Sequence, residues 1–265
     1  MKQLGLFTFG ALGLGIFALS LLQARDASQP TEQPQDVIAR SLAASVQLYT
    51  EREGGVHRWA SGVAVANGEA GQTIILTAAH LLVPQIPQAI YAISPGSDAR
   101  VEDRLLGIDE NADVAILEAS IKNIAPVVLQ SDARLGDGVW VVSFPWGRRG
   151  TVVRGVVSQI AVADADTGLP VSGPVGLIDA AVSYGTSGGG VFDARTGHLV
   201  GLVRGYRTAK LALPGTPPQT LDIPIAGETT VIPATVIRCS VARTALDAPL
   251  KAYIAGTAPS SCTAT

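Results

Sequence analysis

Short apolar runs separated by turn residues recur along most of the chain, and they restrict the fold more than any other feature. Turns that contain Gly, Pro or Asp alternate with these runs. The first set ends near residue 120 and comprises SVQLYT, ASGVAVA, QTIILTAA, QAIYAIS, RVEDRLLGID and DVAILEAS. Val, Ile and Thr, which favour strands, are frequent in these runs. The pattern predicts an all-β protein.

A second set of runs follows a connecting stretch and comprises GVWVVSF, TVVRGVVSQIAVA, GLIDAAVS, GGVFDA and HLVGLVRGY. Two sets of about six strands predict two β-barrels packed together, over residues 41–130 and 136–245, with a natural cleft between them. The segment PATVIRCSVARTAL, which begins at Pro233, predicts a short C-terminal helix. Residues 246–265 are interpreted as a C-terminal tail.

The N-terminal segment indicates export. Lys2 is its one early charge, and the stretch from Gln3 to Ala24 carries none. Residues 1–24 are therefore interpreted as a signal peptide, cleaved or retained as a membrane anchor. Residues 25–40 are polar and rich in Pro and Gln, which predicts a linker. We expect the protein in the periplasm or outside the cell.

Charge and cysteine content exclude some classes of site. The net charge is −3 and no basic stripe is present, so nucleic acid is not an expected partner. Cys239 and Cys262 are the only cysteines. In an exported protein they are a disulfide candidate, and two unrelated free thiols are the alternative. Two cysteines and three scattered histidines lack ligand spacing, so no metal site or cofactor is expected.

The segment YGTSGGGVFD at residues 184–193 is a candidate nucleophile turn. Glycines permit positive φ angles and close approach of other groups. Ser187 in such a turn can expose its hydroxyl beside inward-facing N–H groups, as a nucleophile with an oxyanion hole requires. The alternative is a flexible Gly/Ser turn between strands. The choice between them depends on whether a base and an orienting acid are present.

His80 and Asp113 are the candidates for that base and that acid. His80 follows the apolar run QTIILTAA directly, whereas His57 and His198 lie in a charged stretch and a turn. Asp113 opens the run VAIL, where a partly buried carboxylate needs a donor such as an imidazole N–H. A polar strand cap and a turn residue are the structural alternatives. With His80 and Asp113 in the first strand set and Ser187 in the second, a cleft between barrels would bring the three together as a triad.

The order TAAH at 77–80, DVAIL at 113–117 and GTSGG at 185–189 resembles the chymotrypsin-like serine proteases. SGVAV at 61–65 and DAAVSYGTSGG at 179–189 look most like the bacterial HtrA (Deg) branch. The resemblance covers about residues 40–245 and implies a double six-stranded β-barrel over a protease domain at 41–245. It also implies that the N–H groups of Gly185 and Ser187, with Thr186 between them, form the oxyanion hole.

The chain departs from the family pattern at two positions near Ser187. Thr186 stands where Asp or Asn is usual, so it cannot form the buried ion pair that activates digestive zymogens. Gly190 stands where Pro or another small residue is usual, which loosens the turn. Oxyanion-hole order is therefore expected to depend on a substrate or partner. The short remainder after Val241 predicts no peptide-binding PDZ domain.

The resemblance also assigns the pocket for the P1 residue, the residue before the cleaved bond. It would be formed by Ala181 and by the strand residues Leu202, Val203, Arg204 and Gly205. No acid stands at Ala181, so cleavage after Lys or Arg is not favoured, and a small or medium apolar P1 residue is expected.

Together these patterns predict a serine endopeptidase that acts on proteins or peptides through an acyl-enzyme intermediate. GTSGG also fits the nucleophile elbow of α/β-hydrolases, but that family needs the order Ser, Asp, His and alternating helices. A protease fold that has lost activity and serves as a binding protein is the remaining alternative. The natural substrate and the oligomeric state are not indicated by the sequence.

Overall fold

The computed structural model describes residues 33–68, 71–121, 124–130, 132–161, 171–214, 219–244 and Cys262. The expected signal segment at 1–24 and most of the expected tail at 246–265 lie outside these residues. None of the helices in the described ranges is long and apolar enough to cross a membrane.

The first half of the described chain forms a closed six-stranded antiparallel barrel with the strand order β1-β2-β3-β6-β5-β4. Apolar side chains from alternate positions fill it, among them Leu48, Ile75 and Leu117, all fully buried. Its strands are β1 (Ser45–Glu51), β2 (His57–Asn67), β3 (Thr73–Ala78), β4 (Ala89–Ile93), β5 (Val101–Asp109) and β6 (Val114–Ala119).

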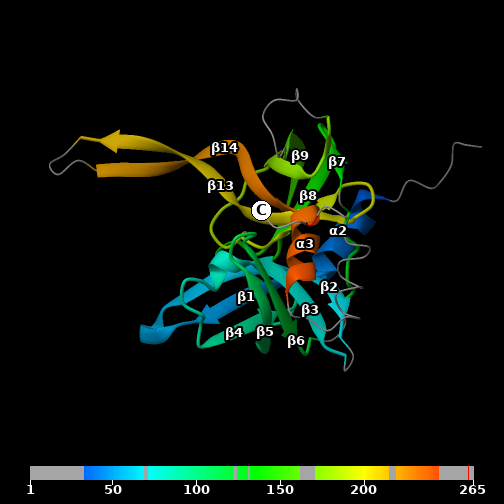
Figure 1. Ribbon diagram of the computed structural model, residues 1–265, viewed down its shortest axis with the longest axis vertical. Helices are drawn as coiled ribbons and strands as arrows, with labels where there is room; N and C mark the ends of the chain where they lie inside the picture. The colour runs from blue at the N-terminus through cyan, green and yellow to red at the C-terminus, as the bar shows by residue number, and fades with distance from the viewer. Residues whose placement is uncertain are drawn as a thin grey trace, which may run out of the picture. The chain divides into compact units, whose positions relative to one another are not determined.

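The second half forms another closed six-stranded barrel with the order β11-β14-β13-β12-β8-β9 (Figure 1). A two-stranded sheet of β7 (Ala133–Arg134) and β10 (Ser172–Gly173) accompanies it. The predicted double six-stranded barrel is thus confirmed. The barrel strands are β8 (Gly138–Ser143), β9 (Thr151–Ile160), β11 (Val175–Asp179), β12 (Gly190–Asp193), β13 (Leu199–Leu213) and β14 (Gln219–Pro233).

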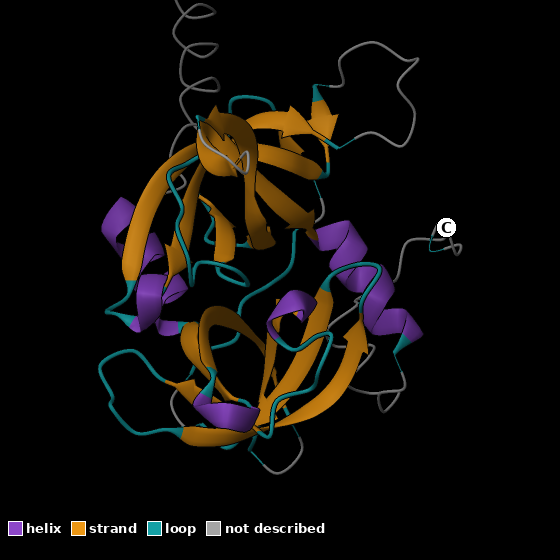
Figure 2. Cartoon of the chain, turned by 90° about the vertical axis from the view of Figure 1, so that its left-hand side faces the viewer, coloured by secondary structure: helices purple, strands orange, loops and turns teal. Residues whose placement is uncertain are grey.

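Helices lie at the edges of the two groups of strands (Figure 2). The C-terminal helix α3 (Ala234–Arg243) confirms the helix expected after Pro233, and its buried residues recur at helical spacing. Helix α2 (Pro34–Ala43) corrects the expected linker, because residues 34–40 are helical. Only Val37 and Ser41 of this helix are buried, so no broad apolar stripe marks it within a polar segment of the sequence. The 3-10 turns are η1 (Glu53–Gly55), η2 (Ala79–Leu81) and η3 (Pro145–Gly147).

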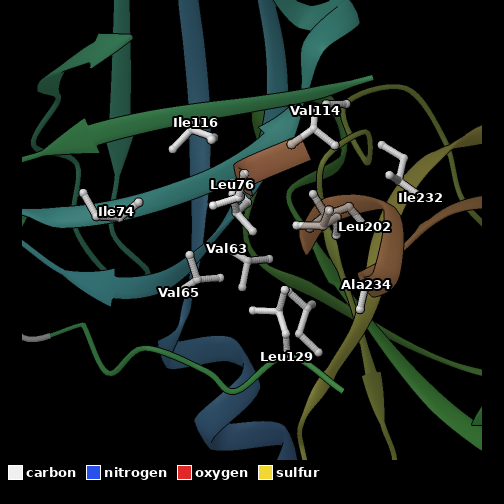
Figure 3. Close-up of a cluster of buried hydrophobic side chains, with 14 of the residues drawn as sticks. Val63, Val65, Ile74, Leu76, Val114, Ile116, Leu129, Leu202, Ile232 and Ala234 are labelled. Atoms are coloured by element: carbon white, nitrogen blue, oxygen red, sulfur yellow. The ribbon is translucent and has the colours of Figure 1, made fainter. Parts of the chain in front are cut away.

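One buried cluster joins the two barrels and α3 (Figure 3). Val63 and Leu76 come from the first barrel, Leu202 and Ile232 from the second, and Ile237 from α3. Because burial of such side chains is the main favourable term in folding, the cluster fixes the barrels against each other. The loops that carry His80, Asp113 and Ser187 therefore meet across a packed interface.

Candidate active site

His80 and Asp113 are held together by the first barrel. His80 lies in η2, directly after β3, and Asp113 directly precedes β6, which pairs with β3. The His80 backbone N–H donates to Asp113 Oδ1 at 2.9 Å, and His80 Nδ1 lies 3.1 and 3.0 Å from Oδ1 and Oδ2. Asp113 has a φ of 58°, a left-handed conformation that a non-glycine residue rarely adopts. The turn thus holds the carboxylate under the imidazole.

The carboxylate of Asp113 is charged at neutral pH despite its burial. Its side chain is 8% exposed, compared with 46% for His80. Burial alone would raise the pKa of Asp113, but the hydrogen bonds and charge of His80 and the charge of Arg204 outweigh it and hold that pKa below its usual value. An ionised carboxylate at this place can keep the Nδ1 proton on His80 and leave Nε2 facing the cleft.

Arg204 of β13 supplies a contact to Asp113 that the sequence interpretation did not contain. Its Nε lies 3.4 Å from Asp113 Oδ2, and its side chain is 59% exposed. Sequence reasoning placed Arg204 only in the P1 pocket. This contact could have been predicted from the position of Arg204 in the strand after the nucleophile turn, because the family resemblance places that strand beside the triad.

The turn that carries Ser187 requires glycine at two positions. Gly185 and Gly188 have φ angles of 88° and 76°. A Cβ on Gly185 would lie 2.7 Å from the backbone N of Trp146, and one on Gly188 only 2.2 Å from Thr77 Oγ1. Both the backbone conformation and the space therefore exclude larger residues.

Two backbone N–H groups of this turn have no hydrogen-bond partner among the described residues. Thr186 N donates to the carbonyl of Ser183 at 3.1 Å. The N–H groups of Gly185 and Ser187 donate to no group in the described part of the chain. Two unpaired donors flanking one paired residue are the arrangement that an oxyanion hole needs.

Ser61 of β2 connects the first barrel to this turn, and sequence reasoning missed it. Its Oγ donates to the Gly185 carbonyl at 2.8 Å and accepts from the Phe144 N–H at 2.9 Å. Its backbone N–H donates to the Ser187 carbonyl at 2.9 Å. Ser61 is fully buried. It lies in the SGVAV motif, but strand periodicity carries no sign that a hydroxyl there reaches the other barrel.

Ser187 lines a cavity whose other walls come from both barrels. The cavity has a volume of about 360 Å³, and His80, Gly185, Ser187 and Arg204 all line it. The hydroxyl donates to the Arg204 carbonyl at 3.5 Å, and no hydrogen bond between it and His80 is present among the described residues. A larger open groove of about 900 Å³ continues past His80, Asp113 and Arg204.

The smaller cavity is lined by some of the residues expected to form the P1 pocket. Val203, Arg204 and Gly205 line it. Leu202 does not, because strand alternation turns its side chain into the buried cluster between the barrels. Ala181 is exposed and does not line it either. The wall before the nucleophile turn is instead formed by residues closer to Ser187 in the chain, namely Val182, Ser183 and Tyr184.

The two cysteines also come together. Cys239 of α3 forms a disulfide with Cys262 at an S–S distance of 2.06 Å. Within the described ranges, no group of three His, Cys, Asp or Glu side chains is placed to hold a metal ion.

Comparison with known proteins places these features in a family context. The family described as trypsin-like peptidase domain matches residues 60–202. The probable periplasmic serine endoprotease DegP-like of Bartonella henselae is 36% identical over 122 residues, which are 45% of this chain and 23% of that protein. The serine protease HtrA-like of Staphylococcus epidermidis is 30% identical over 154 residues, 54% of this chain and 26% of that protein. The chain spans about a quarter to a third of the length of such curated relatives.

Two solved structures show the same fold. The active form of the Rv3671c protease from M. tuberculosis has a TM-score of 0.61 at 21% identity, covering 80% of this chain and 85% of that one. The HtrA-type protease AlgW with tripeptide has a TM-score of 0.57 at 23% identity, covering 76% and 60%. At these identities the likeness concerns the fold.

Proposed function

The chain belongs to the trypsin-like peptidase family, and we propose that it is a serine endopeptidase whose reaction is carried by Ser187, His80 and Asp113. The observation that carries the proposal is the pairing of His80 Nδ1 with the buried Asp113 carboxylate at the rim of the cavity that Ser187 lines. A base oriented by an acid beside a hydroxyl is the arrangement that activates a serine.

The proposed reaction has two halves. In the first, Ser187 Oγ attacks the carbonyl carbon of the scissile peptide while its proton passes to His80 Nε2. The carbonyl oxygen gains negative charge and is stabilised by the N–H groups of Gly185 and Ser187. His80 then gives the proton to the leaving amine, and an acyl-enzyme on Ser187 remains. In the second half, water attacks the ester while His80 takes its proton; the bond between the acyl carbon and Ser187 Oγ then breaks, His80 returns the proton to Oγ, and the free acid leaves. Asp113 stabilises the charged imidazole in each half.

One rearrangement must precede the attack. The Ser187 hydroxyl has to leave the Arg204 carbonyl and turn toward His80, by rotation about its Cα–Cβ bond. Catalytic hydrogen bonds in unliganded enzymes are often long and tighten only with substrate. A substrate N–H that bonds to the Arg204 carbonyl would release the hydroxyl to the imidazole. Substrate binding would thus complete the triad, as the sequence departures at Thr186 and Gly190 also suggest.

The cavity favours a small or medium apolar P1 residue. Its lining residues in the described chain include no carboxylate, so nothing there would neutralise Lys or Arg. Arg58 and Arg204 at its edge would repel a cationic side chain further. Val182 and Val203 offer apolar wall. Cleavage profiling with a peptide library tests this: cuts confined to Lys or Arg at P1 would refute it.

We place this activity outside the cytoplasm. The uncharged stretch from Gln3 to Ala24 is typical of an export signal, cleaved or retained. One curated relative is named as periplasmic. Polypeptides in that compartment are the proposed substrates.

Covalent labelling with a fluorophosphonate probe tests the proposed activity, with Ser187→Ala and His80→Ala as controls. Labelling of the wild-type protein that is lost in both variants supports the triad. The contact of Ser187 Oγ with Arg204 favours a second candidate, a protease-fold binding protein without activity. Folded wild-type protein that resists the probe, even with added peptides, would support that candidate and overturn the endopeptidase.

A further inference from the structure

A two-stranded ribbon projects from the second barrel, formed by residues 204–213 of β13 and 219–228 of β14 and here called the arm (Figure 1). β12 pairs with β13 only as far as Leu202, and β11 pairs with β14 only at Thr229 and Thr230. Beyond these points the two strands pair with each other alone, and nearly every arm residue is exposed. Such a ribbon has two open edges, which are sites for pairing with another chain.

One face of the arm is apolar. Leu211 lies directly opposite Leu221, and Ala209 opposite Ile223, so these four side chains share a face. Leu211 and Leu221 are 48% and 51% exposed. Large apolar side chains gathered on an exposed surface mark an interaction site.

The other face of the arm carries a charged cross-strand pair, in which Lys210 lies opposite Asp222. At the base of the arm, where the register of the two strands shifts, Arg207 forms an ion pair with Glu228 at 3.5 Å. Beyond Arg204, which contacts Asp113, the arm carries two basic and two acidic side chains, so it presents no net charge that would repel a neutral apolar strand.

The open edge of β13 starts at the candidate nucleophile. Gly188 N donates to the Val203 carbonyl at 2.8 Å, and Ser187 Oγ donates to the next carbonyl, of Arg204. The following two residues, Gly205 and Tyr206, line both the cavity and the larger groove. A chain acylated at Ser187 would leave the cavity along this edge.

We propose that the arm extends the substrate cleft, so that the polypeptide before the scissile bond adds to β13 as an antiparallel third strand over the length of the arm. Main-chain hydrogen bonds would give affinity, and every second substrate side chain would join the apolar face of Ala209, Leu211 and Ile223. From Gly205 to Leu213 an extended strand spans about 30 Å, enough for about eight substrate residues. The substrate class is then a locally unfolded polypeptide with apolar residues at alternate positions. This inference rests on the proposed peptidase activity.

Two peptides and two double variants test the arm. The peptides share one cleavage site, but one starts four residues before the scissile bond and the other ten, with alternating apolar residues. Leu211→Ser with Leu221→Ser removes the centre of the apolar face. Lys210→Ser with Asp222→Ser changes the adjacent cross-strand pair on the polar face and is the matched control. All four positions are exposed, and none is part of the proposed triad.

We expect the wild-type protein to cleave the long peptide with a kcat/KM at least tenfold above that for the short one. The leucine variant should bring this ratio close to one, and the control variant should keep it. Fluorophosphonate labelling and short-peptide cleavage should be equal in all three proteins, which also reports that each is folded.

Three outcomes overturn the inference, and they are distinguishable. If the wild-type protein is labelled and cleaves both peptides equally well, the proposed role of the arm is refuted, but the proposed peptidase activity stands. A leucine variant that keeps the wild-type ratio of kcat/KM between the two peptides refutes the role of the apolar face in substrate binding. If light scattering then shows a wild-type dimer that becomes a monomer in this variant, the arm instead joins two copies of the chain. Absence of both labelling and cleavage refutes the proposed peptidase, and the arm's role with it.

Discussion

Ser61→Ala should impair the oxyanion hole from the opposite barrel. The change removes one hydroxyl that bonds to both the Gly185 carbonyl and the Phe144 N–H. Both groups are buried and would lose this partner. An unsatisfied buried polar group costs about 1–3 kcal/mol, so we expect a loss of about 2–4 kcal/mol in the free energy of unfolding. The Gly185 peptide would also lose the bond that sets its orientation.

The effect on catalysis should appear in kcat. The N–H of Gly185 is one of two proposed oxyanion donors, and loss of one such donor costs about 10²- to 10³-fold in kcat. Because Ser61→Ala misorients the donor without removing it, a fall of about tenfold is expected, with little change in KM. The assay is steady-state cleavage of a short peptide together with the fluorophosphonate labelling rate, both at a temperature where the variant is folded.

Ser45→Ala is the matched control for this prediction. Ser45 is also fully buried in the first barrel, and its Oγ donates to the Ser41 carbonyl at 2.8 Å, away from the Ser187 turn. Both variants should melt at lower temperature, but only Ser61→Ala should lower kcat. If the two variants lose stability alike and both keep the wild-type kcat, the reasoning on Ser61 is refuted.

Three further predictions concern Asp113, Asp103 and Cys239. Asp113→Asn should lower kcat by about 10³- to 10⁴-fold in peptide cleavage, because an amide cannot hold the imidazole as a charged carboxylate does; wild-type kcat would contradict the triad. Burial raises the pKa of Asp103 to about 8, so the folded state keeps a proton that the unfolded state has lost from about pH 4 upward, and stability falls as pH rises to about 8. Asp103→Asn should therefore raise the melting temperature more at pH 9 than at pH 5, by about 10 °C, and an equal change at both pH values would contradict this. Cys239→Ser opens the loop closed by the disulfide, whose ends are 23 residues apart, and should lower the free energy of unfolding by about 3 kcal/mol in chemical unfolding; an unchanged value would contradict this.

The sequence predicted the barrels because their strands bury one face and therefore alternate or form apolar runs. No strand was predicted over β14, because most of residues 219–228 are exposed and the segment is interrupted by Pro224 and Gly227. No burial pattern is imposed on such a ribbon. The arm could therefore not be predicted from sequence periodicity.

The candidate site shows a similar division. His80, Asp113 and Ser187 were recognisable because each follows or precedes an apolar run in a characteristic order. Ser61 and the Arg204–Asp113 contact were not, because both depend on which side chains face each other across the barrel interface. Strand periodicity does not show such pairs, and only the family resemblance brings the strand of Arg204 near Asp113.

These cross-barrel contacts make the site a property of the packed pair of barrels. Ser61 of the first barrel holds the turn that carries Ser187 in the second, and Arg204 of the second contacts Asp113 of the first. Each barrel therefore positions a residue of the candidate active site that belongs to the other barrel. Any change that loosens the buried cluster between them should disturb both contacts at once, whereas a change inside one barrel should disturb neither. A loss of activity should therefore follow loosening of the interface between the barrels more closely than a fall in the free energy of unfolding of either barrel.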